Sequence, residues 1–274
     1  MESRNTVGKP CALVTGASAG IGAAIAARLL AEGYEVWGSA RDTTRLVAKP
    51  GFHPLALDLH DGDGVGRAFL TAQREAGGAF DVVVNNAGYG LFGPVESAPF
   101  ERWAAQLDAM LAQTIRLSLL ALPALRTRRR GAIVNVTSMA VEFPIPGMSG
   151  YNAAKAGLSA WTQSQAYELV GSGVLAIDLR PGDIRTSFNA VLVSAVEPAA
   201  EGRWARVRRR FDHMHAVAPH PEQVATDLWC ALRRGRSGVV RSGSFFQVRL
   251  APLIARLGSD RLRHAVQARY FDLR

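Results

Sequence analysis

The sequence has little cysteine: Cys11 and Cys230 are the only two among 274 residues. Neither stands in a C-x-x-C pair, so the sequence offers no disulfide framework and no structural zinc site of the usual spacing. The pair His213 and His215 has no further ligand near it, and we expect no metal. Isolated cysteines are typical of a reducing compartment, so a cytoplasmic location is expected.

Long apolar runs are missing as well. The most apolar stretch, residues 117–125, is much shorter than the roughly 20 residues that cross a bilayer. It also contains Pro123, and the opening "MESRNTVGKP" lacks the apolar segment of a secretory signal. We therefore expect no integral membrane segment. Because no linker-like composition interrupts the chain, residues 1–274 are expected to form a single domain.

Lysine is scarce: only Lys9, Lys49 and Lys155 occur, so arginine accounts for most of the net charge of +9. A strongly basic chain raises the question of nucleic acid. The cluster at 126–131 ends at a glycine and is typical of a helix C-terminus, where arginines complement the helix dipole and glycine serves as the C′ residue. The cluster at 203–211 lies in a segment that we expect to be mobile. Neither accompanies a nucleic-acid motif, so no nucleic-acid partner is expected.

Apolar runs alternate with amphipathic segments of helical length. The runs predict strands at residues 11–16, 34–40, 52–58, 80–88, 131–138 and 174–182. The other segments predict helices up to residue 32, at 62–76, 100–128 and 150–171, and from near 221 onward. Strands that are apolar on both faces and alternate with helices indicate a parallel sheet covered on both sides. The predicted fold class is α/β, a doubly wound, Rossmann-like parallel sheet in three αβα layers.

A glycine-rich turn, "TGASAGIG" at 15–22, follows the first predicted strand and opens a helix. Its spacing is G-x-x-x-G-x-G, which differs from the G-x-G-x-x-G fingerprint. The physics is shared, because glycine permits a tight turn and the helix N-terminus presents free N–H groups to phosphate. The turn predicts a phosphate site, with a purely structural turn as the alternative.

The end of the second predicted strand bears on the choice of cofactor. It reads "GSARD", with Arg41 one step past the strand and Asp42 behind it. An arginine accommodates a 2′-phosphate, whereas a carboxylate would accept hydrogen bonds from a 2′-hydroxyl. Ser18 in the glycine turn could add a hydroxyl donor. The pattern favours NADP(H) over NAD(H), unless Arg41 pairs with Asp42 or with solvent.

The stretch "SGYNAAKAGL" at 149–158 places Tyr151 and Lys155 four residues apart among small, helix-forming residues. Positions i and i+4 share a helix face, so the phenol and the ammonium point the same way. Two interpretations stay open at this point: the tyrosine packs on the lysine stem, or the lysine controls the proton of the phenol.

Taken together, these motifs resemble the short-chain dehydrogenase/reductase family over residues 10–240. The motifs are "TGASAGIG", "LDL" at 57–59, "NNAG" at 85–88, "IVNVTS" ending at 138, "YNAAK", and "RPGDIRT" at 180–186. Ser138 lies thirteen residues before Tyr151, as the family pattern requires. A weaker resemblance is to the branch with hydroxysteroid- and retinol-dehydrogenase-like enzymes.

The resemblance implies a role for each matching residue. Tyr151 is implied as the general acid/base and Ser138 as a hydrogen-bond partner of the substrate oxygen, while Lys155 holds the nicotinamide ribose and lowers the pKa of the phenol. An ammonium about 4 Å away contributes on the order of 4 kcal/mol at an effective dielectric of 20, which is enough to bring a phenol pKa of about 10 near 7. The implied cofactor-binding residues, beside Tyr151 and Lys155, are Gly16, Ser18, Gly20, Ile21, Gly22, Arg41, Asp58, Leu59, Asn85, Ala87, Gly88, Pro181, Gly182, Ile184 and Thr186.

One position departs from the family pattern. The family has an asparagine in the long helix thirteen residues before a proline, and here Met110 stands there, counted back from Pro123. Methionine lacks an amide and cannot reproduce its hydrogen bonds. Gln113 lies one turn later, and its amide could reach into the same region. We expect a proton relay that is weakened but not abolished.

The last third of the chain is expected to shape the substrate site. A connection as long as 183–220 is typical of a lid. Its aromatic and apolar side chains, and those that follow Ser138, could roof an apolar substrate or only pack the lid onto the body. These are Phe143, Ile145, Met148, Phe188, Trp204, Phe211 and Met214.

A basic helical extension, 243–274, is expected to close the pocket, or else to dock on a partner subunit or touch an anionic membrane, in that order. Its apolar positions are Leu253, Leu257, Leu262, Val266 and Tyr270.

The sequence thus predicts an NADP(H)-dependent oxidoreductase for a small-molecule carbonyl or alcohol that is bulky and mostly apolar. Reduction is the expected direction because cellular NADPH is kept reduced, and a homodimer or homotetramer is expected. The alternative is a cofactor-binding sensor or scaffold with little turnover. Met110 favours that alternative, whereas the intact Ser138, Tyr151 and Lys155 favour the enzyme.

Overall fold

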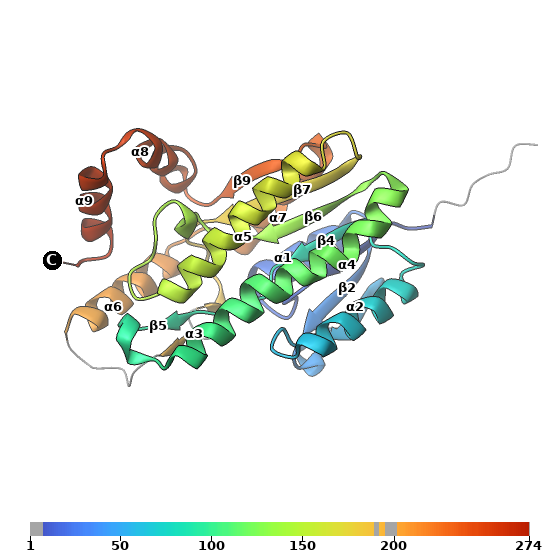
Figure 1. Ribbon diagram of the computed structural model, residues 1–274, viewed down its shortest axis with the longest axis horizontal. Helices are drawn as coiled ribbons and strands as arrows, with labels where there is room; N and C mark the ends of the chain where they lie inside the picture. The colour runs from blue at the N-terminus through green and yellow to red at the C-terminus, as the bar shows by residue number, and fades with distance from the viewer. Residues whose placement is uncertain (1–7, 189–191, 195–201, 274) are drawn as a thin grey trace, which may run out of the picture.

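The computed structural model describes residues 8–188, 192–194 and 202–273, so parts of the predicted lid, 189–191 and 195–201, lie outside the described residues. Seven parallel strands form one sheet in the order β3-β2-β1-β4-β6-β7-β9, and β5 and β8 form a short parallel pair (Figure 1). The strands are β1 Cys11–Val14, β2 Glu35–Ala40, β3 Phe52–Ala56, β4 Val82–Asn85, β5 Leu91–Phe92, β6 Gly131–Val136, β7 Val174–Pro181, β8 Val193–Ser194 and β9 Gly238–Ser242. The α-helices are α1 Gly20–Ala31, α2 Gly62–Glu75, α3 Phe100–Leu107, α4 Gln113–Arg128, α5 Ser149–Glu168, α6 Arg203–Ala216, α7 Pro221–Arg234, α8 Ala251–Leu257 and α9 Asp260–Tyr270.

The strands are apolar on both faces because each face supports a separate core. Successive side chains of a strand point to opposite faces. In β1, Val14 therefore joins the core beneath α1 and α7 with Leu228, while its neighbour Leu13 joins the core beneath α2 and α4 with Phe69. The three-layer, doubly wound α/β fold predicted from the sequence is confirmed.

The order of the strands reverses between β1 and β4, and the turns after these two strands are bonded to each other. The hydroxyl of Thr15 accepts hydrogen bonds from the N–H groups of Asn86 at 2.9 Å and Ala87 at 3.0 Å. In return, the amide Nδ2 of Asn86 donates to the Thr15 carbonyl at 2.9 Å. In doubly wound sheets such a switch point opens a crevice at the carboxyl ends of the strands.

Two elements differ from the sequence-based expectation. The segment expected to be mobile contains α6, whose Val207, Phe211 and Met214 are buried at helical spacing among arginines. A seventh strand, β9, was not predicted; it is a short edge strand that pairs with β7 from Gly238 to Ser242. Its side chains are only partly buried over most of its length, so it lacks the strong apolar signal of the central strands.

The long predicted helix at 100–128 forms as one continuous stretch that a π-turn divides, at Asp108–Ala112. Among the described residues, this stretch alone is long and apolar enough by length and composition to cross a membrane, yet Leu117 and Leu125 join the core under the sheet. Its C-terminus is basic as predicted. The glycine does not cap it, however, because Arg129 takes the left-handed conformation with φ of 50° and Gly131 already begins β6.

After β9 the chain forms the predicted helical extension. Figure 1 shows α8 and α9 near α6 at one end of the sheet, away from α2. Tyr270 and Phe271 pack against the buried side chains of α6. The end of the chain therefore adds a wall to that side of the molecule.

Gly22 offers a test of how closely the first helix must approach the sheet. A Cβ at this position would lie 2.2 Å from the Gly16 carbonyl oxygen and 2.5 Å from Nδ2 of Asn86. We expect Gly22→Ala to lower the free energy of unfolding by about 1–3 kcal/mol, although alanine favours helices. Gly8→Ala is the control, because its Cβ would meet nothing within 4 Å. Equal melting temperatures of the two variants would contradict the prediction.

Candidate active site

A cavity of about 880 Å³ lies at the carboxyl ends of the central strands. Its wall is formed by the segments after β1, β2, β3, β4, β6 and β7, by α6 and by the C-terminal extension. The predicted site residues that it brings together are Gly16, Ser18, Gly20, Ile21, Arg41, Asp58, Leu59, Ala87, Gly88, Ser138, Tyr151, Lys155, Pro181, Gly182, Ile184 and Thr186. Two predicted residues, Gly22 and Asn85, do not border it.

The glycine turn forms a cradle at the start of α1. Gly16 and Gly20 adopt φ of 69° and 56°, in the left-handed region that side chains disfavour. No side chain caps the helix at Ala19, so the first N–H groups stay available at the cavity wall. A Cβ on Gly20 would lie 3.2 Å from Thr186 across the cradle. This chain's residues thus fit the phosphates of a dinucleotide cofactor.

The two asparagines of "NNAG" have different roles. Asn85 is buried in β4, where its Nδ2 donates to Ser118 at 2.9 Å and to Asn135 at 2.8 Å. Asn86 borders the cavity instead. Adjacent residues at a strand end point to opposite sides, which explains why the predicted contact of Asn85 is taken by its neighbour.

Arg41 borders the cavity beyond β2 and is exposed. The carboxylate of Asp42 accepts hydrogen bonds from the N–H of Thr44 at 3.0 Å and from its hydroxyl at 2.7 Å, and these bonds lower the pKa of Asp42. Within the described residues Arg41 forms no ion pair, so the structure does not contain the Arg41–Asp42 pair considered above. Arg45, which sequence reasoning missed, also borders this part of the cavity.

Ser138, Tyr151 and Lys155 meet at the centre of the wall. Ser138 starts the turn after β6 and accepts the Ala140 N–H at 3.0 Å, which leaves its own hydroxyl proton free to be donated. Ser138 and Tyr151 both border the cavity, and the Ser138 side chain lowers the pKa of the Tyr151 phenol. The Lys155 Nζ donates to the Val136 carbonyl at 2.6 Å and lies 5.8 Å from the centre of the Tyr151 ring.

Burial shifts the ionisation of both groups on α5. Desolvation raises the pKa of Tyr151 above its ordinary value, and the neighbouring Ser138 side chain opposes this only in part. This direction is opposite to the lowering of the phenol pKa that the family resemblance implies. Desolvation also lowers the pKa of Lys155 to about 8, against the opposing effect of the Asp178 carboxylate.

Met110 occupies the floor of the site within the π-turn and is buried. A Cβ on Gly88 would lie 3.1 Å from the Met110 methyl group and 3.8 Å from the Lys155 Nζ, so both side chains reach the surroundings of Gly88. The expectation for Gln113 is wrong: its Nε2 donates to the Asp108 carboxylate at 3.2 Å, and it does not border the cavity. The π-turn shifts the register between the two positions, so they do not share a face.

The outer half of the cavity is apolar. Phe143, Ile145, Phe188 and Phe211 border it as predicted for a substrate roof. Of the other predicted roof residues, Met148, Trp204 and Met214 pack behind this wall and do not reach the cavity.

The C-terminal extension closes this half of the cavity. Asp183 accepts hydrogen bonds from the Tyr270 hydroxyl and from Nε2 of Gln247, both at 2.6 Å. Gln267 of α9 donates to the Pro144 carbonyl at 2.6 Å. Burial, and next the Asp183 carboxylate, raise the pKa of Tyr270, so its hydroxyl stays a donor.

The apolar positions of the extension divide into two sets. Val266 and Tyr270 border the cavity, whereas Leu253, Leu257 and Leu262 are 53%, 73% and 48% exposed. The sequence alone did not distinguish the inner set from the outer one.

No cluster of three or more metal-ligating side chains occurs within 8–188, 192–194 and 202–273. Of the two histidines noted in the sequence, His215 borders the cavity and its Nδ1 pairs with the Phe211 carbonyl at 3.1 Å.

The parallel sheet, its switch point and the glycine cradle define a Rossmann-like α/β protein. Comparisons with known proteins identify its family. The sequence profile of the family described as "short chain dehydrogenase" matches residues 10–197. The chain belongs to the short-chain dehydrogenase/reductase family, and it is an oxidoreductase of that family.

Individual relatives agree. The bovine (Bos taurus) protein "Dehydrogenase/reductase SDR family member 4" is 36% identical over 70% of this chain and 72% of its own length. A short-chain dehydrogenase from Streptomyces avermitilis has a TM-score of 0.79 at 26% identity, over 95% of this chain and 96% of that chain. A short-chain dehydrogenase from Burkholderia cenocepacia, solved with NADP, has a TM-score of 0.71 at 26% identity, over 96% and 97%.

The lowered pKa of Lys155 makes a prediction about stability. Lys155 is charged in both states below pH 8, whereas between pH 8 and 10.5 the folded protein has lost this proton and the unfolded chain has not. The contribution of Lys155 to stability should therefore rise with pH across this window, by roughly 3 kcal/mol at most. Lys155→Met should remove this rise and increase the free energy of unfolding by roughly 1–3 kcal/mol at pH 7. Lys49→Met, at an exposed position, is the control in urea unfolding, and a retained rise in Lys155→Met would contradict the assignment.

Proposed function

We propose that the protein is an NADP(H)-dependent oxidoreductase that interconverts a carbonyl and an alcohol on a bulky, mostly apolar substrate. The observation that carries this proposal is that Ser138, Tyr151 and buried Lys155 lie in the same cavity wall as the glycine cradle. The same proposal includes that the protein acts as a homodimer or homotetramer in the cytoplasm, and this part rests on the sequence alone.

The preference for NADP(H) is supported by two arginines. Arg41 and Arg45 border the cavity beyond β2, while the nearby carboxylate of Asp42 is occupied by Thr44. A guanidinium pairs well with a phosphate. The Burkholderia cenocepacia relative binds NADP, which agrees with this choice.

In the proposed reaction, the residues of this chain bind the substrate oxygen and move its proton. The nicotinamide cofactor supplies or accepts the hydride when bound. Ser138 donates a hydrogen bond to the substrate oxygen, since its own oxygen already accepts the Ala140 N–H. Tyr151 protonates that oxygen during reduction, and Lys155 holds the reacting groups in place.

The raised pKa of Tyr151 supports the reducing direction. At neutral pH the phenol keeps its proton and is ready to donate it, whereas alcohol oxidation needs the phenolate. Because the phenol pKa lies above its ordinary value of about 10, the fraction of phenolate, and with it the rate of alcohol oxidation, should increase with pH up to at least pH 10.

The apolar half of the cavity supports a bulky substrate. Phe143, Phe188, Phe211 and Phe271 border it, and the bond between Tyr270 and Asp183 holds the extension over it. Burial of apolar substrate surface there is favourable by roughly 25 cal/mol per Å².

One observation favours a second function, a cofactor-binding sensor or scaffold with little turnover. Met110 borders the same cavity as Lys155, and its thioether side chain cannot replace an amide that would hold a water able to resupply the proton. A protein of this kind would bind NADPH tightly and reduce nothing in a broad panel of ketones and aldehydes.

Arg41 tests the cofactor assignment. The unmodified protein should bind NADPH at least tenfold more tightly than NADH, which corresponds to about 1.4 kcal/mol. Arg41→Ala should remove most of that difference and leave NADH binding unchanged. Dissociation constants come from quenching of protein fluorescence, with Arg126→Ala, at an exposed position of α4 outside the cavity lining, as the control. Equal affinities of the unmodified protein for both cofactors would rule out the assignment.

Tyr151 tests the chemistry. Tyr151→Phe keeps the ring and removes the proton, so NADPH affinity should hold while turnover falls about a hundredfold or more. In the unmodified protein, reduction should change little from pH 6 to 9, and oxidation should rise steadily, because the phenol pKa is raised. A loss of less than tenfold would exclude Tyr151 as the proton donor, and oxidation that peaks below pH 8 would contradict the raised phenol pKa.

A further inference from the structure

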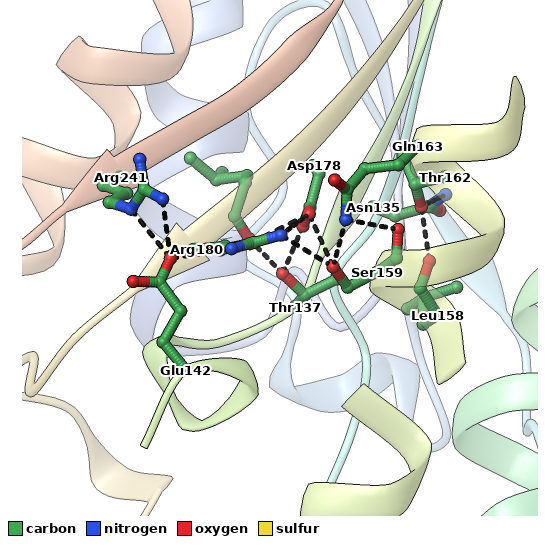
Figure 2. Close-up of polar contacts among 11 residues, drawn as sticks. Asn135, Thr137, Glu142, Leu158, Ser159, Thr162, Gln163, Asp178, Arg180 and Arg241 are labelled. Carbon is green, nitrogen blue, oxygen red and sulfur yellow. Dashed lines mark hydrogen bonds and ion pairs between the residues drawn. The ribbon is translucent and has the colours of Figure 1, made fainter. Parts of the chain in front are cut away.

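A group of charged side chains lies behind the wall of the cavity (Figure 2). Asp178 and Arg180 belong to β7, Glu142 follows the turn that Ser138 begins, and Arg241 belongs to β9. Asp178 is 1% exposed and Arg180 is 6% exposed. None of the four borders the cavity, so they are not contacts of a substrate or cofactor.

Asp178 is the centre of this group and accepts hydrogen bonds from three elements. The Thr137 hydroxyl donates to Oδ1 at 2.5 Å, and the Ser159 hydroxyl donates to Oδ2 at 2.7 Å. Arg180 donates to Oδ2 through Nε at 2.9 Å. Hydrogen bonds to a buried, ionised acceptor are short and strongly directional, so they fix the positions of their donors.

The remaining charges hold Arg180 in turn. Its Nη1 donates to Oε1 of Glu142 at 2.7 Å. The same Oε1 accepts from Nε of Arg241 at 2.9 Å and from Nη2 at 2.7 Å. In the order of these contacts, Asp178, Arg180, Glu142 and Arg241, the charges alternate in sign. Each charged group therefore has a neighbour of opposite charge.

The donors to Asp178 adjoin the residues proposed to be catalytic. Thr137 directly precedes Ser138, and Ser159 lies one helical turn after Lys155 on the same face of α5. The strand end that carries Ser138 and the helix that carries Tyr151 are therefore bonded to one carboxylate. Buried ion pairs seldom stabilise a fold more than apolar side chains of the same size would, so stability alone does not account for this arrangement.

We propose that Asp178 is a positioning residue, which through Thr137 and Ser159 fixes Ser138 relative to Tyr151 and Lys155. Arg180, with Glu142 and Arg241 behind it, holds the carboxylate in place. The proposal rests on the proposed function, in which Ser138 and Tyr151 must meet the same substrate oxygen. A small displacement of one of them can cost about a hundredfold in rate.

The test uses Thr137→Val, which keeps the shape of a side chain that borders the cavity and removes its bonds to Asp178 and to the Leu179 carbonyl. We expect kcat for carbonyl reduction to fall at least tenfold, with KM and the dissociation constant of NADPH within twofold. Thr137→Ser restores the hydroxyl and should recover most of kcat.

Thr162→Val is the matched control. Thr162 is also buried, lies on α5, and accepts from Nδ2 of Asn135 at 2.8 Å, but it does not contact Asp178 (Figure 2). Its loss should lower the melting temperature and leave kcat within twofold. The proposal fails if Thr137→Val only lowers the melting temperature, or if Thr162→Val loses as much kcat.

A second readout does not depend on turnover. With tyrosines labelled at Cζ with ¹³C, Tyr151→Phe identifies the signal of Tyr151 among the five tyrosines. Thr137→Val should shift this signal, because the neighbouring Ser138 side chain influences the phenol and would move, whereas Thr162→Val should not. If the unmodified protein reduces no carbonyl, the proposed function fails and this spectrum decides about Asp178; an unshifted signal in Thr137→Val overturns the positioning role.

Discussion

The close contact between the turns after β1 and β4 is the constraint on which the rest of the structure depends. Thr15 and Asn86 bond these turns to each other, and Gly22 lets the first helix approach them without a Cβ between. This contact places the start of α1 over the switch point of the sheet, where its free N–H groups face the cavity. The position of every other wall is set relative to this cradle.

The site combines two groups, a phenol and an ammonium, whose buried environment disfavours their charged forms. The Tyr151 phenol is desolvated and keeps its proton, while desolvation makes the Lys155 ammonium easier to deprotonate. Both effects follow from the apolar surroundings, to which the Met110 methyl contributes. Asp178 is the buried charge that opposes the effect on Lys155, and it also bonds the elements on either side of the site. The same carboxylate thus links electrostatics and geometry.

The structure also explains where sequence reasoning failed near the site. The sequence does not show which of the two asparagines of "NNAG" faces the cofactor site. Because side chains alternate along a strand, Asn85 lies in the core and Asn86 borders the cavity. The π-turn moves Gln113 away from Lys155 through one extra residue per turn, which a helical period of 3.6 does not reveal. The apolar face of α6 was not recognised, because its few apolar residues are separated in the sequence by arginines and the segment is polar on average.

The sequence by itself determined the α/β class, the alternation of the first six sheet strands with helices along the chain, the glycine turn, and Ser138, Tyr151 and Lys155 as one candidate group. These depend on local patterns, such as alternation, helix spacing and backbone freedom, which neighbouring residues specify. Only the tertiary structure decided the pairing of β9, the closure of the cavity by Tyr270 on Asp183, and the direction of the Tyr151 pKa shift. Each of these depends on segments that are distant in sequence, because desolvation and hydrogen bonding act between whatever groups the fold brings together.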